Sequence, residues 1–424
     1  MKKSHLILLL LFIPLISNAQ IQKKNILFIG NSYTYVNDLP QMFANISAST
    51  FDSIAFSSSS TGGYTFNNHT QDANSLLKIS QGNWDFVILQ EQSQLPSFPI
   101  EQVNVEVFPY ARILDSLIVA QNPCAETVFY MTWGRKNGDA SNCASWPPVC
   151  SYLGMDSLLR LRYTQMATDN HAILSPVSAL WRYLRTHNPT IELYSSDESH
   201  PSNAGTYAAA CSFYSAIFRK DPTLITFNST LSIADAGAIR NAAKAVVFDS
   251  LSTWFVGKYD PKSDFNYSVV GLNVNFINIS EYADQYRWNF GDGDTSIAIN
   301  PSHLFTSSGT KTITLIAKKC GLSDTTTKQI TITPQQIEIN QQTDFELYPN
   351  PTTGILNLKS DINANFDEYI IVNQLGQTII KDDFKKIKGK NSICLAQLQI
   401  GIYSIIFINN KNQRRVIKKI IKID

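Results

Sequence analysis

The stretch Asn25-Ile26-Leu27-Phe28-Ile29-Gly30, followed by Asn31-Ser32-Tyr33-Thr34, gives the first indication of the fold. A short apolar run closed by glycine is typical of a buried parallel strand that ends in a sharp turn. A serine in that turn would present its hydroxyl at the carboxyl edge of the sheet, where open α/β folds bind ligands. The pattern is common by itself, and the alternative is that Ser32 only caps the next helix.

The rest of the chain up to about residue 255 alternates between two kinds of segment. Apolar runs like the first one predict strands at 53–57, 86–90, 127–132, 172–175 and 191–194. Apolar residues at helical spacing predict helices at 103–119, 156–166, 203–219 and 233–254. This alternation predicts a parallel sheet covered by helices on both faces.

The pattern changes after a junction at Pro261 and Lys262. Short period-two stretches separated by turn residues fill 264–333, among them 270–276, 285–289, 311–317 and 325–333, and they predict an all-β sandwich. A polar linker at 334–343 is followed by a second strand-like region that reaches residue 424. We therefore expect three domains, at 20–258, 262–335 and 343–424.

The first 19 residues have the features of a secretory signal peptide. Lys2 and Lys3 precede an apolar run at 6–16, and Ser17-Asn18-Ala19 provides a small-residue exit with cleavage expected after Ala19. A membrane anchor is the alternative, but the run is too short to cross a bilayer comfortably. No later stretch is long and apolar enough, so we expect no transmembrane span in the mature chain.

The composition narrows the possible functions. Of 424 residues, 44% are hydrophobic and 16% charged, which is typical of globular proteins and unlike disordered or membrane-embedded ones. The net charge of +1 gives no reason to expect a nucleic-acid partner. The motifs predict no cofactor, and no cysteine pair has the spacing of zinc ligands.

A second motif with chemical potential is Asp197-Glu198-Ser199-His200-Pro201. An aspartate and a histidine three residues apart in a turn can touch, so that the carboxylate fixes the imidazole tautomer. His200 could then take a proton from Ser32, whose hydroxyl is a poor nucleophile without such a base. The alternative is a surface loop in which Asp197 caps a helix.

Together the two motifs resemble those of the SGNH (GDSL-like) hydrolase family. Gly30-Asn31-Ser32 is similar to that family's first block, normally Gly-Asp-Ser, and Asp197-x-x-His200-Pro201 to its last. The resemblance covers roughly residues 24–255. It implies a three-layer α/β fold and ester hydrolysis through an acyl-enzyme, with Ser32 as nucleophile and Asp197 and His200 as its acid–base partners.

The same resemblance implies an oxyanion hole, a set of donors for the developing negative charge. The backbone N–H groups of Ser32 and of Gly63, in Gly62-Gly63, are candidates, although a simple Gly-Gly turn is the alternative. Family members also use an asparagine within Gly-x-Asn-Asp, whereas this chain has Gln90-Glu91-Gln92-Ser93-Gln94. Gln94 falls nearest the asparagine position and Gln92 at the family's glycine. One such donor is typically worth about 3 kcal/mol of barrier.

Other residues are assigned structural roles. Trp133 ends the predicted fourth strand and could stack on a sugar, although a loop packed on itself is the simpler interpretation. His69 lies in a polar stretch and is expected on the solvated surface. Cys143 and Cys150 are close enough in sequence for a local disulfide. The remaining cysteines are expected to be buried thiols, namely Cys124, Cys211, Cys320 and Cys394.

The segment after residue 264 resembles a PKD (polycystic-kidney-disease) repeat domain. The resemblance rests on Trp288-Asn289-Phe290-Gly291-Asp292-Gly293-Asp294, followed by His303. Such domains act as extracellular spacers or weak binding modules, which makes His303 part of the fold pattern. The aspartate cluster is interpreted as a tight turn, with a calcium site as the alternative.

The last segment, from residue 343, resembles the C-terminal sorting domain of the type IX secretion system. Its signature is Tyr348-Pro349-Asn350-Pro351-Thr352-Thr353-Gly354, followed by Gly401-Ile402-Tyr403. The resemblance implies that the type IX secretion machinery is a partner. It also implies a protein carried across the inner membrane by its signal peptide and then across the outer membrane, and released or held at the cell surface.

Three functional hypotheses follow. The first is a secreted ester hydrolase acting on an ester substrate, in particular an acetylated polysaccharide. The second is a non-catalytic surface glycan-binding protein on a degenerate hydrolase fold, suggested by the missing Gly-x-Asn-Asp. The third is a structural adhesin, which would require the side chains of Ser32 and His200 to lie far apart.

Overall fold

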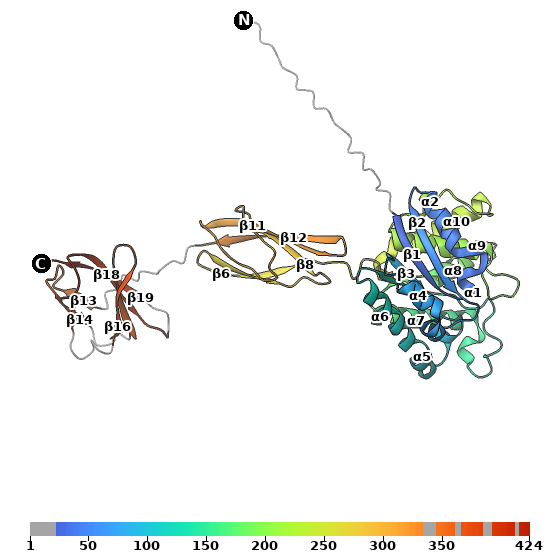
Figure 1. Cartoon of the computed structure of the whole chain (residues 1–424), viewed down its shortest axis with the longest axis horizontal. Helices are drawn as coiled ribbons and strands as arrows, with labels where there is room; N and C mark the ends of the chain where they lie inside the picture. Colours follow the sequence, from blue (N-terminus) through green and yellow to red (C-terminus); the bar gives the residue numbers. More distant parts are fainter. Residues whose placement is uncertain (1–22, 334–344, 361–365, 385–391, 412–414) are drawn as a thin grey trace, which may run out of the picture. The chain divides into compact units, whose positions relative to one another are not determined.

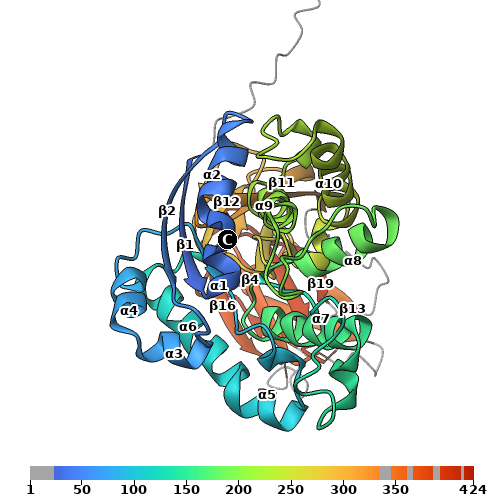
Figure 2. The same ribbon diagram turned by 90° about the vertical axis from the view of Figure 1, so that its right-hand side faces the viewer.

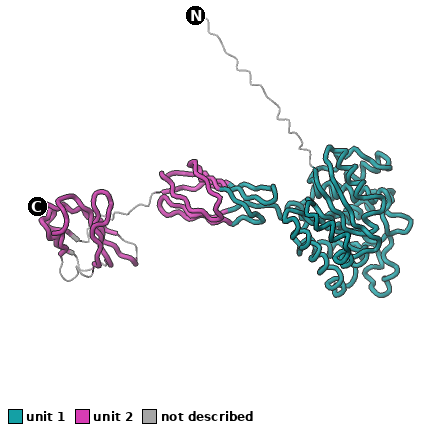
Figure 3. Tube along the Cα trace, in the orientation of Figure 1, with its two compact units in different colours: residues 1–264, 279–287, 315–326 teal, residues 265–278, 288–314, 327–424 magenta. Residues whose placement is uncertain are grey.

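The computed structural model describes residues 23–333, 345–360, 366–384, 392–411 and 415–424 (Figure 1). The predicted signal peptide and the predicted linker lie outside these ranges. The chain divides into two compact units (Figure 3). The first joins the described residues up to 264 with 279–287 and 315–326, and the second holds 265–278, 288–314 and the described residues from 327 onward.

The first unit is built on a five-stranded sheet with the order β2-β1-β3-β4-β5. Its strands are β1 (Lys23–Gly30), β2 (Ser53–Ser60), β3 (Phe86–Leu89), β4 (Glu126–Tyr130) and β5 (Ile173–Ser175). Every neighbouring pair is parallel. The order reverses at β1, whose two neighbours are β2 and β3, so the loops after β1 and β3 leave the sheet at the switch point where such folds bind ligands.

Helices cover both faces of the sheet (Figure 2). One group contains α2 (Leu39–Ala48), α8 (Val177–His187), α9 (Asn203–Phe218) and α10 (Ile233–Val246). The other contains α3 (Phe66–Gln71), α4 (Ala73–Ile79), α5 (Ile100–Glu106), α6 (Phe108–Gln121) and α7 (Tyr152–Asp169). A single apolar core runs through the three layers. The predicted three-layer α/β fold is confirmed.

Three predicted segments differ in detail from the structure. The helix expected over 103–119 is two helices, because the backbone leaves helical geometry at Val107, just before Pro109 in the first turn of α6. The helix expected over 233–254 continues after Val246 as a 3-10 helix, Phe248–Trp254. The strand expected over 191–194 forms only one bridge, between Tyr194 and Pro201.

The next region is a β-sandwich, as predicted. One sheet has the order β10-β7-β6 and the other β12-β11-β8-β9. The strands are β6 (Phe265–Val270), β7 (Asn273–Asn278), β8 (Gln285–Asn289), β9 (Thr295–Ser296), β10 (Ser302–Leu304), β11 (Gly309–Lys319) and β12 (Leu322–Ile332). The stretch predicted over 270–276 contains the end of β6, the hairpin turn and part of β7, because Gly271 turns the chain with φ +63°.

The last region is also all-β. Its sheets are β13-β14-β17 and β16-β15-β18-β19. The strands are β13 (Phe345–Tyr348), β14 (Ile355–Ser360), β15 (Glu368–Val372), β16 (Thr378–Asp383), β17 (Ser392–Cys394), β18 (Gly401–Ile408) and β19 (Arg415–Lys422). The side chain of Asn350 donates to Lys419 O (2.7 Å) and accepts from Ile421 N (2.8 Å), so the Pro-Asn-Pro signature binds β19.

The prediction that four cysteines are buried thiols holds only for Cys211. Cys124, in the loop before β4, forms a disulfide with Cys320, in the turn between β11 and β12, and both belong to the first compact unit. The expected local disulfide between Cys143 and Cys150 is present. Cys211 is buried as predicted, whereas Cys394 is exposed. The Cys124–Cys320 pair escaped prediction because its members are 196 residues apart and each lies in apolar or strand-like sequence.

Candidate active site

The two predicted motifs meet in space. The Oγ of Ser32 lies 2.8 Å from Nε2 of His200, and Nδ1 of His200 is hydrogen-bonded to the carboxylate of Asp197. The second carboxylate oxygen of Asp197 accepts from the backbone N–H groups of Ser199 (3.1 Å) and His200 (2.9 Å). The adhesin hypothesis required the side chains of Ser32 and His200 to lie far apart, and this contact contradicts it.

The turn that carries Ser32 is held by the end of β3. A Cβ on Gly30 would lie 2.4 Å from Thr34 Oγ1 and 2.7 Å from Gln90 Oε1, so the turn has room only for glycine. Gln90 Oε1 accepts from the backbone N–H of Asn31 and the hydroxyl of Thr34, both at 2.9 Å. The side chain of Asn31 also donates to Tyr64 O at 2.9 Å, which connects the turn to the loop after β2.

A stack of aromatic rings packs against His200. Tyr33 packs edge-on against His200 at 5.3 Å and stacks on Trp133 at 4.8 Å. Trp133 stacks in turn on Trp181 at 3.7 Å and donates its indole N–H to Ser199 O. Because Trp133 is fully buried in this stack, the idea that it binds a sugar is wrong, and the interpretation as internal packing is confirmed.

The acid–base pair itself is partly open to solvent. The side chains of His200 and Asp197 are 34% and 48% exposed. Partial burial opposes ionisation of Asp197, but hydrogen bonds from the His200 ring and from the backbone N–H groups of Ser199 and His200 outweigh it and lower the pKa of this carboxyl. A carboxylate beside Nδ1 favours the tautomer in which Nε2 accepts a proton from Ser32.

The backbone donors expected for an oxyanion hole lie at these loops. Ser32 is the first residue of α1 (Ser32–Tyr35), so its N–H has no acceptor within the helix. Gly63 is exposed, has φ +74°, and a Cβ there would meet nothing within 4 Å. Gly63 therefore lies in an open, exposed part of the loop after β2.

The two glutamines are engaged with neighbours. Gln94 Nε2 donates to the carboxylate of Asp139 (2.6 Å), and Gln92 Nε2 donates to Gln94 Oε1 (3.1 Å). Gln92 Oε1 accepts from the backbone N–H groups of Gln94 (2.7 Å) and Leu95 (3.0 Å). Each Nε2 has a second hydrogen that these bonds do not use. Sequence reasoning missed Asp139, a fully buried residue that the long loop after β4 brings to Gln94.

His69 is a second correction, because it is fully buried and not on the surface. Its Nε2 donates to Gly30 O at 2.8 Å, directly before the serine turn, and its Nδ1 lies 2.8 Å from Ser75 Oγ. Burial lowers the pKa of His69. The polar residues next to His69 in sequence suggested solvent, but its ring turns inward and binds the carbonyl of Gly30 and the hydroxyl of Ser75.

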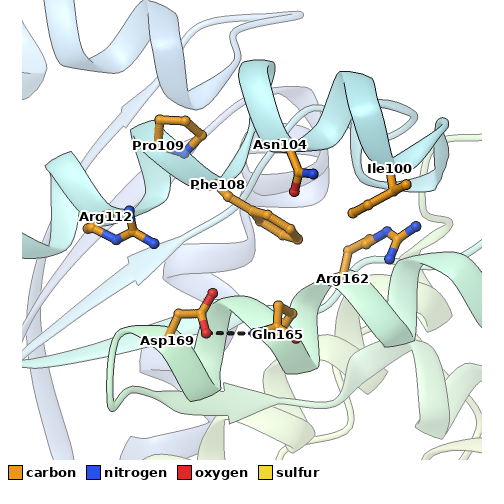
Figure 4. A pocket seen from close by; sticks show the side chains of 8 residues that line it. All are labelled: Ile100, Asn104, Phe108, Pro109, Arg112, Arg162, Gln165 and Asp169. Carbon is orange, nitrogen blue, oxygen red and sulfur yellow. Dashed lines mark hydrogen bonds between the residues drawn. The ribbon is translucent and has the colours of Figure 1, made fainter.

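A cavity of about 390 Å³ lies elsewhere, between α5, α6 and α7 (Figure 4). Its lining includes Phe108, Arg112 and Arg162, with Gln165 bonded to Asp169 at 2.6 Å. None of the predicted site residues lines it. The candidate active site is thus formed by the loops at the carboxyl edge of the sheet and not by this cavity.

The sandwich contains another aspartate–histidine pair. Nε2 of His303 lies 2.7 Å from the carboxylate of Asp292, and its ring stacks on Phe290 at 4.2 Å. Ligand atoms of Asp292, Asp294 and His303 lie within 4.8 Å of one another. Asp294 N also donates to Asp292 Oδ1, which is the turn that the sequence predicted.

Two family models match the later regions of the chain. The model described as a PKD domain matches residues 265–333, and the model described as a secretion system C-terminal sorting domain matches residues 346–423. Both predicted resemblances are confirmed. The sorting domain indicates export to the cell surface or secretion. In the described parts of the chain, no helix combines the length and apolar character needed to cross a membrane.

Solved structures similar to the first region include three of interest. A DUF4886 family protein from Bacteroides uniformis is 15% identical, with a TM-score of 0.47 over 53% of this chain and 94% of its own. A candidate SGNH hydrolase from Slackia heliotrinireducens is 26% identical (TM-score 0.38; 46% and 99% covered). An esterase from Pseudoalteromonas is 15% identical (TM-score 0.35; 46% and 97%). No curated protein sequence matches the chain.

Proposed function

We propose that this chain is a secreted serine ester hydrolase that acts through an acyl-enzyme, with Ser32 as nucleophile, His200 as general base and Asp197 as its orienting carboxylate. The observation that carries the proposal is the continuous hydrogen-bond chain from Ser32 Oγ through His200 to Asp197. A hydroxyl, an imidazole and a carboxylate in this order are the parts that acyl transfer needs.

The chemistry follows from the geometry. His200 Nε2 accepts the proton of Ser32 as its Oγ attacks the ester carbonyl, and Asp197 stabilises the imidazolium that forms. The tetrahedral oxyanion is stabilised by the N–H groups of Ser32 and Gly63, together with the unused amide hydrogen of Gln94 or Gln92. His200 then returns the proton to the leaving alcohol, and water hydrolyses the acyl-enzyme by the same relay.

The substrate class that fits best is an acetylated carbohydrate. The sorting domain indicates a location at the cell surface or outside, where polysaccharides are available. The PKD domain would serve there as a spacer or weak binding module. The partly exposed acid–base pair suits an acyl group on a large polymer better than a buried tunnel would. A signal peptide at residues 1–19, cut after Ala19, would deliver the chain to the second export step.

The test is hydrolysis of 4-nitrophenyl acetate and of acetylated xylan by the full chain and by Ser32→Ala. We expect the wild type to release acetate and to be labelled by a fluorophosphonate probe, and Ser32→Ala to do neither while keeping its circular dichroism spectrum. Equal turnover by the two proteins would refute the catalytic role of Ser32.

A second candidate is a non-catalytic glycan-binding protein on the same fold. One observation favours it: the amide of Gln94 is directed to Asp139, in place of a free asparagine donor. Binding of the wild type to acetylated xylan without acetate release and without fluorophosphonate labelling would support this candidate over the hydrolase.

A further inference from the structure

Glu91 is a buried carboxyl group in the middle of the candidate site. It directly follows Gln90 at the carboxyl end of β3 and is 0% exposed. An acidic side chain is almost never fully buried unless it is paired or hydrogen-bonded. Because no part of the proposed chemistry uses Glu91, its burial requires another explanation.

The contacts of Glu91 join two loops that carry candidate oxyanion donors. Both carboxyl oxygens lie 3.0 Å from the backbone N of Phe66, the first residue of α3, which follows directly on the Gly62–Thr65 loop. Oε1 also accepts from the backbone N–H of Gln92 at 2.6 Å. One side chain therefore fixes the chain just after Gly63 and the residue that positions Gln94.

We propose that Glu91 is a positioning residue for the oxyanion hole, whose carboxyl oxygen holds the Gly63 loop and the Gln92–Gln94 loop at the spacing that ester hydrolysis requires. This inference rests on the proposed function. Gln90 does the same for the serine turn through Asn31 and Thr34. The run Gln90–Gln94 thus ties together the loops after β1, β2, β3 and β4, the last through Asp139.

The protonation of Glu91 gives the inference a second readout. Burial raises the pKa of Glu91 to about 8, against the lowering effect of the N–H donors of Gln92 and Phe66. Its titratable neighbour on α7 is Tyr163, whose hydroxyl accepts from Glu91 N and whose pKa burial raises, so it stays neutral. His69 on α3 faces Gly30 and Ser75. A pKa of about 8 leaves Glu91 mostly protonated at pH 7. Its ionisation at higher pH would place a negative charge beside groups that must stabilise an oxyanion.

The experiment measures kcat and KM of the full chain for 4-nitrophenyl acetate between pH 6 and 9.5, with Ser32→Ala giving the background at each pH. Glu91→Ala removes the acceptor, and we expect kcat to fall about 100-fold at pH 7 with KM changed less than about threefold. Glu91→Gln keeps one acceptor oxygen and cannot ionise. We expect wild-type kcat to decline above about pH 8 as Glu91 ionises. We expect Glu91→Gln to lose at most about threefold at pH 7 and to show no such decline.

Control variants and contrary outcomes are well defined. Glu101→Gln changes an exposed glutamate on α5 and should match the wild type at every pH. If Glu91→Ala has the kcat of the wild type, or if Glu91→Gln is as impaired as Glu91→Ala, the inference about Glu91 is overturned. The proposed function would still stand. If Glu91→Ala does not fold, the pH profile of Glu91→Gln decides, because an unchanged decline would overturn the inference. Absence of any wild-type turnover would overturn the proposed function as well.

Discussion

Two aspartate–histidine pairs lie within the described residues, and they differ in what the second nitrogen or face of the imidazole contacts. His200 is bonded to Asp197 through Nδ1 and to the hydroxyl of Ser32 through Nε2. His303 is bonded to Asp292 through Nε2, but its ring lies flat on Phe290 at 4.2 Å and edge-on to Phe305 at 4.4 Å. The first pair is 34% and 48% exposed and the second 11% and 16%.

This difference shows that a hydrogen-bonded aspartate–histidine pair is not sufficient for catalysis. An imidazole oriented by a carboxylate becomes a general base only if a proton donor lies within reach of its other nitrogen. In the sandwich the same two side chains are placed among phenylalanine rings, where they stabilise a turn. The following predictions test this division of roles, from the largest expected effect to the smallest.

The largest effect is expected for removal of the base. His200→Ala should lower kcat for 4-nitrophenyl acetate by about 10⁶-fold, because Ser32 then has no proton acceptor. His303→Ala, the matched change in the other pair, should leave kcat within a factor of two. Steady-state kinetics of both variants gives the comparison, and a large loss in His303→Ala would contradict it.

The next effect concerns the carboxylate. Asp197→Asn should lower kcat by about 10⁴-fold, because an amide at Nδ1 favours the wrong tautomer of His200. Asp292→Asn should not change kcat. If Asp197→Asn retained full activity, the hydrogen bond between Asp197 and His200 would have no role in the reaction.

A third variant leaves the pair intact and moves the serine. Gly30→Ala would place a methyl group 2.4 Å from Thr34 Oγ1 and 2.7 Å from Gln90 Oε1, so the turn must shift and carry Ser32 with it. We expect kcat to fall about 100-fold. Gly237→Ala is the control, because its Cβ would meet only the end of Arg240 at 3.9 Å. Equal kinetics for the two alanine variants would show that the turn tolerates a side chain.

For stability the order of the two histidines should reverse. His303→Ala removes a partly buried ring that contacts Phe290 and Phe305 and takes from Asp292 its histidine partner, so we expect a loss of about 1–3 kcal/mol. His200→Ala changes a more exposed ring and should cost less. Calorimetric unfolding of the full chain measures both, and a larger loss for His200→Ala would contradict the structural role of His303.

The smallest effect is a pH dependence of stability. Burial opposes ionisation of Asp292, but hydrogen bonds from His303 and from the backbone N–H of Asp294 lower its pKa. Its contribution is therefore present above its ordinary pKa of about 3.9 and is lost as pH falls through the lowered value. The difference in Tm between wild type and Asp292→Asn should be full at pH 7 and should close below about pH 4. A constant difference across this range would contradict the assignment.

The sequence predicted the parts of the site that local pattern encodes. A strand closed by Gly30 places Ser32 at a sheet edge, and the three-residue spacing of Asp197 and His200 allows contact within one turn. The boundaries were less accurate where backbone geometry decides them, as at Val107 and at Gly271. Both positions interrupt a hydrophobic period that continues across them.

The sequence did not reveal partners supplied by distant segments. Asp139 reaches Gln94 only because the loop after β4 folds back, and Cys124 meets Cys320 across 196 residues. His69 lies among polar residues in sequence, yet it is fully buried and bonded to the carbonyl of Gly30, 39 residues away. In each case the local sequence pattern does not identify the distant residue that the side chain contacts.

The amino-acid sequence by itself therefore determined the alternating α/β character of the first region, the two β-rich regions with their signatures, and the candidate serine, histidine and aspartate, because these depend on local spacing and turn chemistry. The tertiary structure alone decided which imidazole faces a hydroxyl, which partners Gln92 and Gln94 bind, and the burial of Glu91. Those facts depend on loops from four strands that meet at one edge of the sheet. The spacing of residues along the sequence does not predict which of these distant loops come into contact.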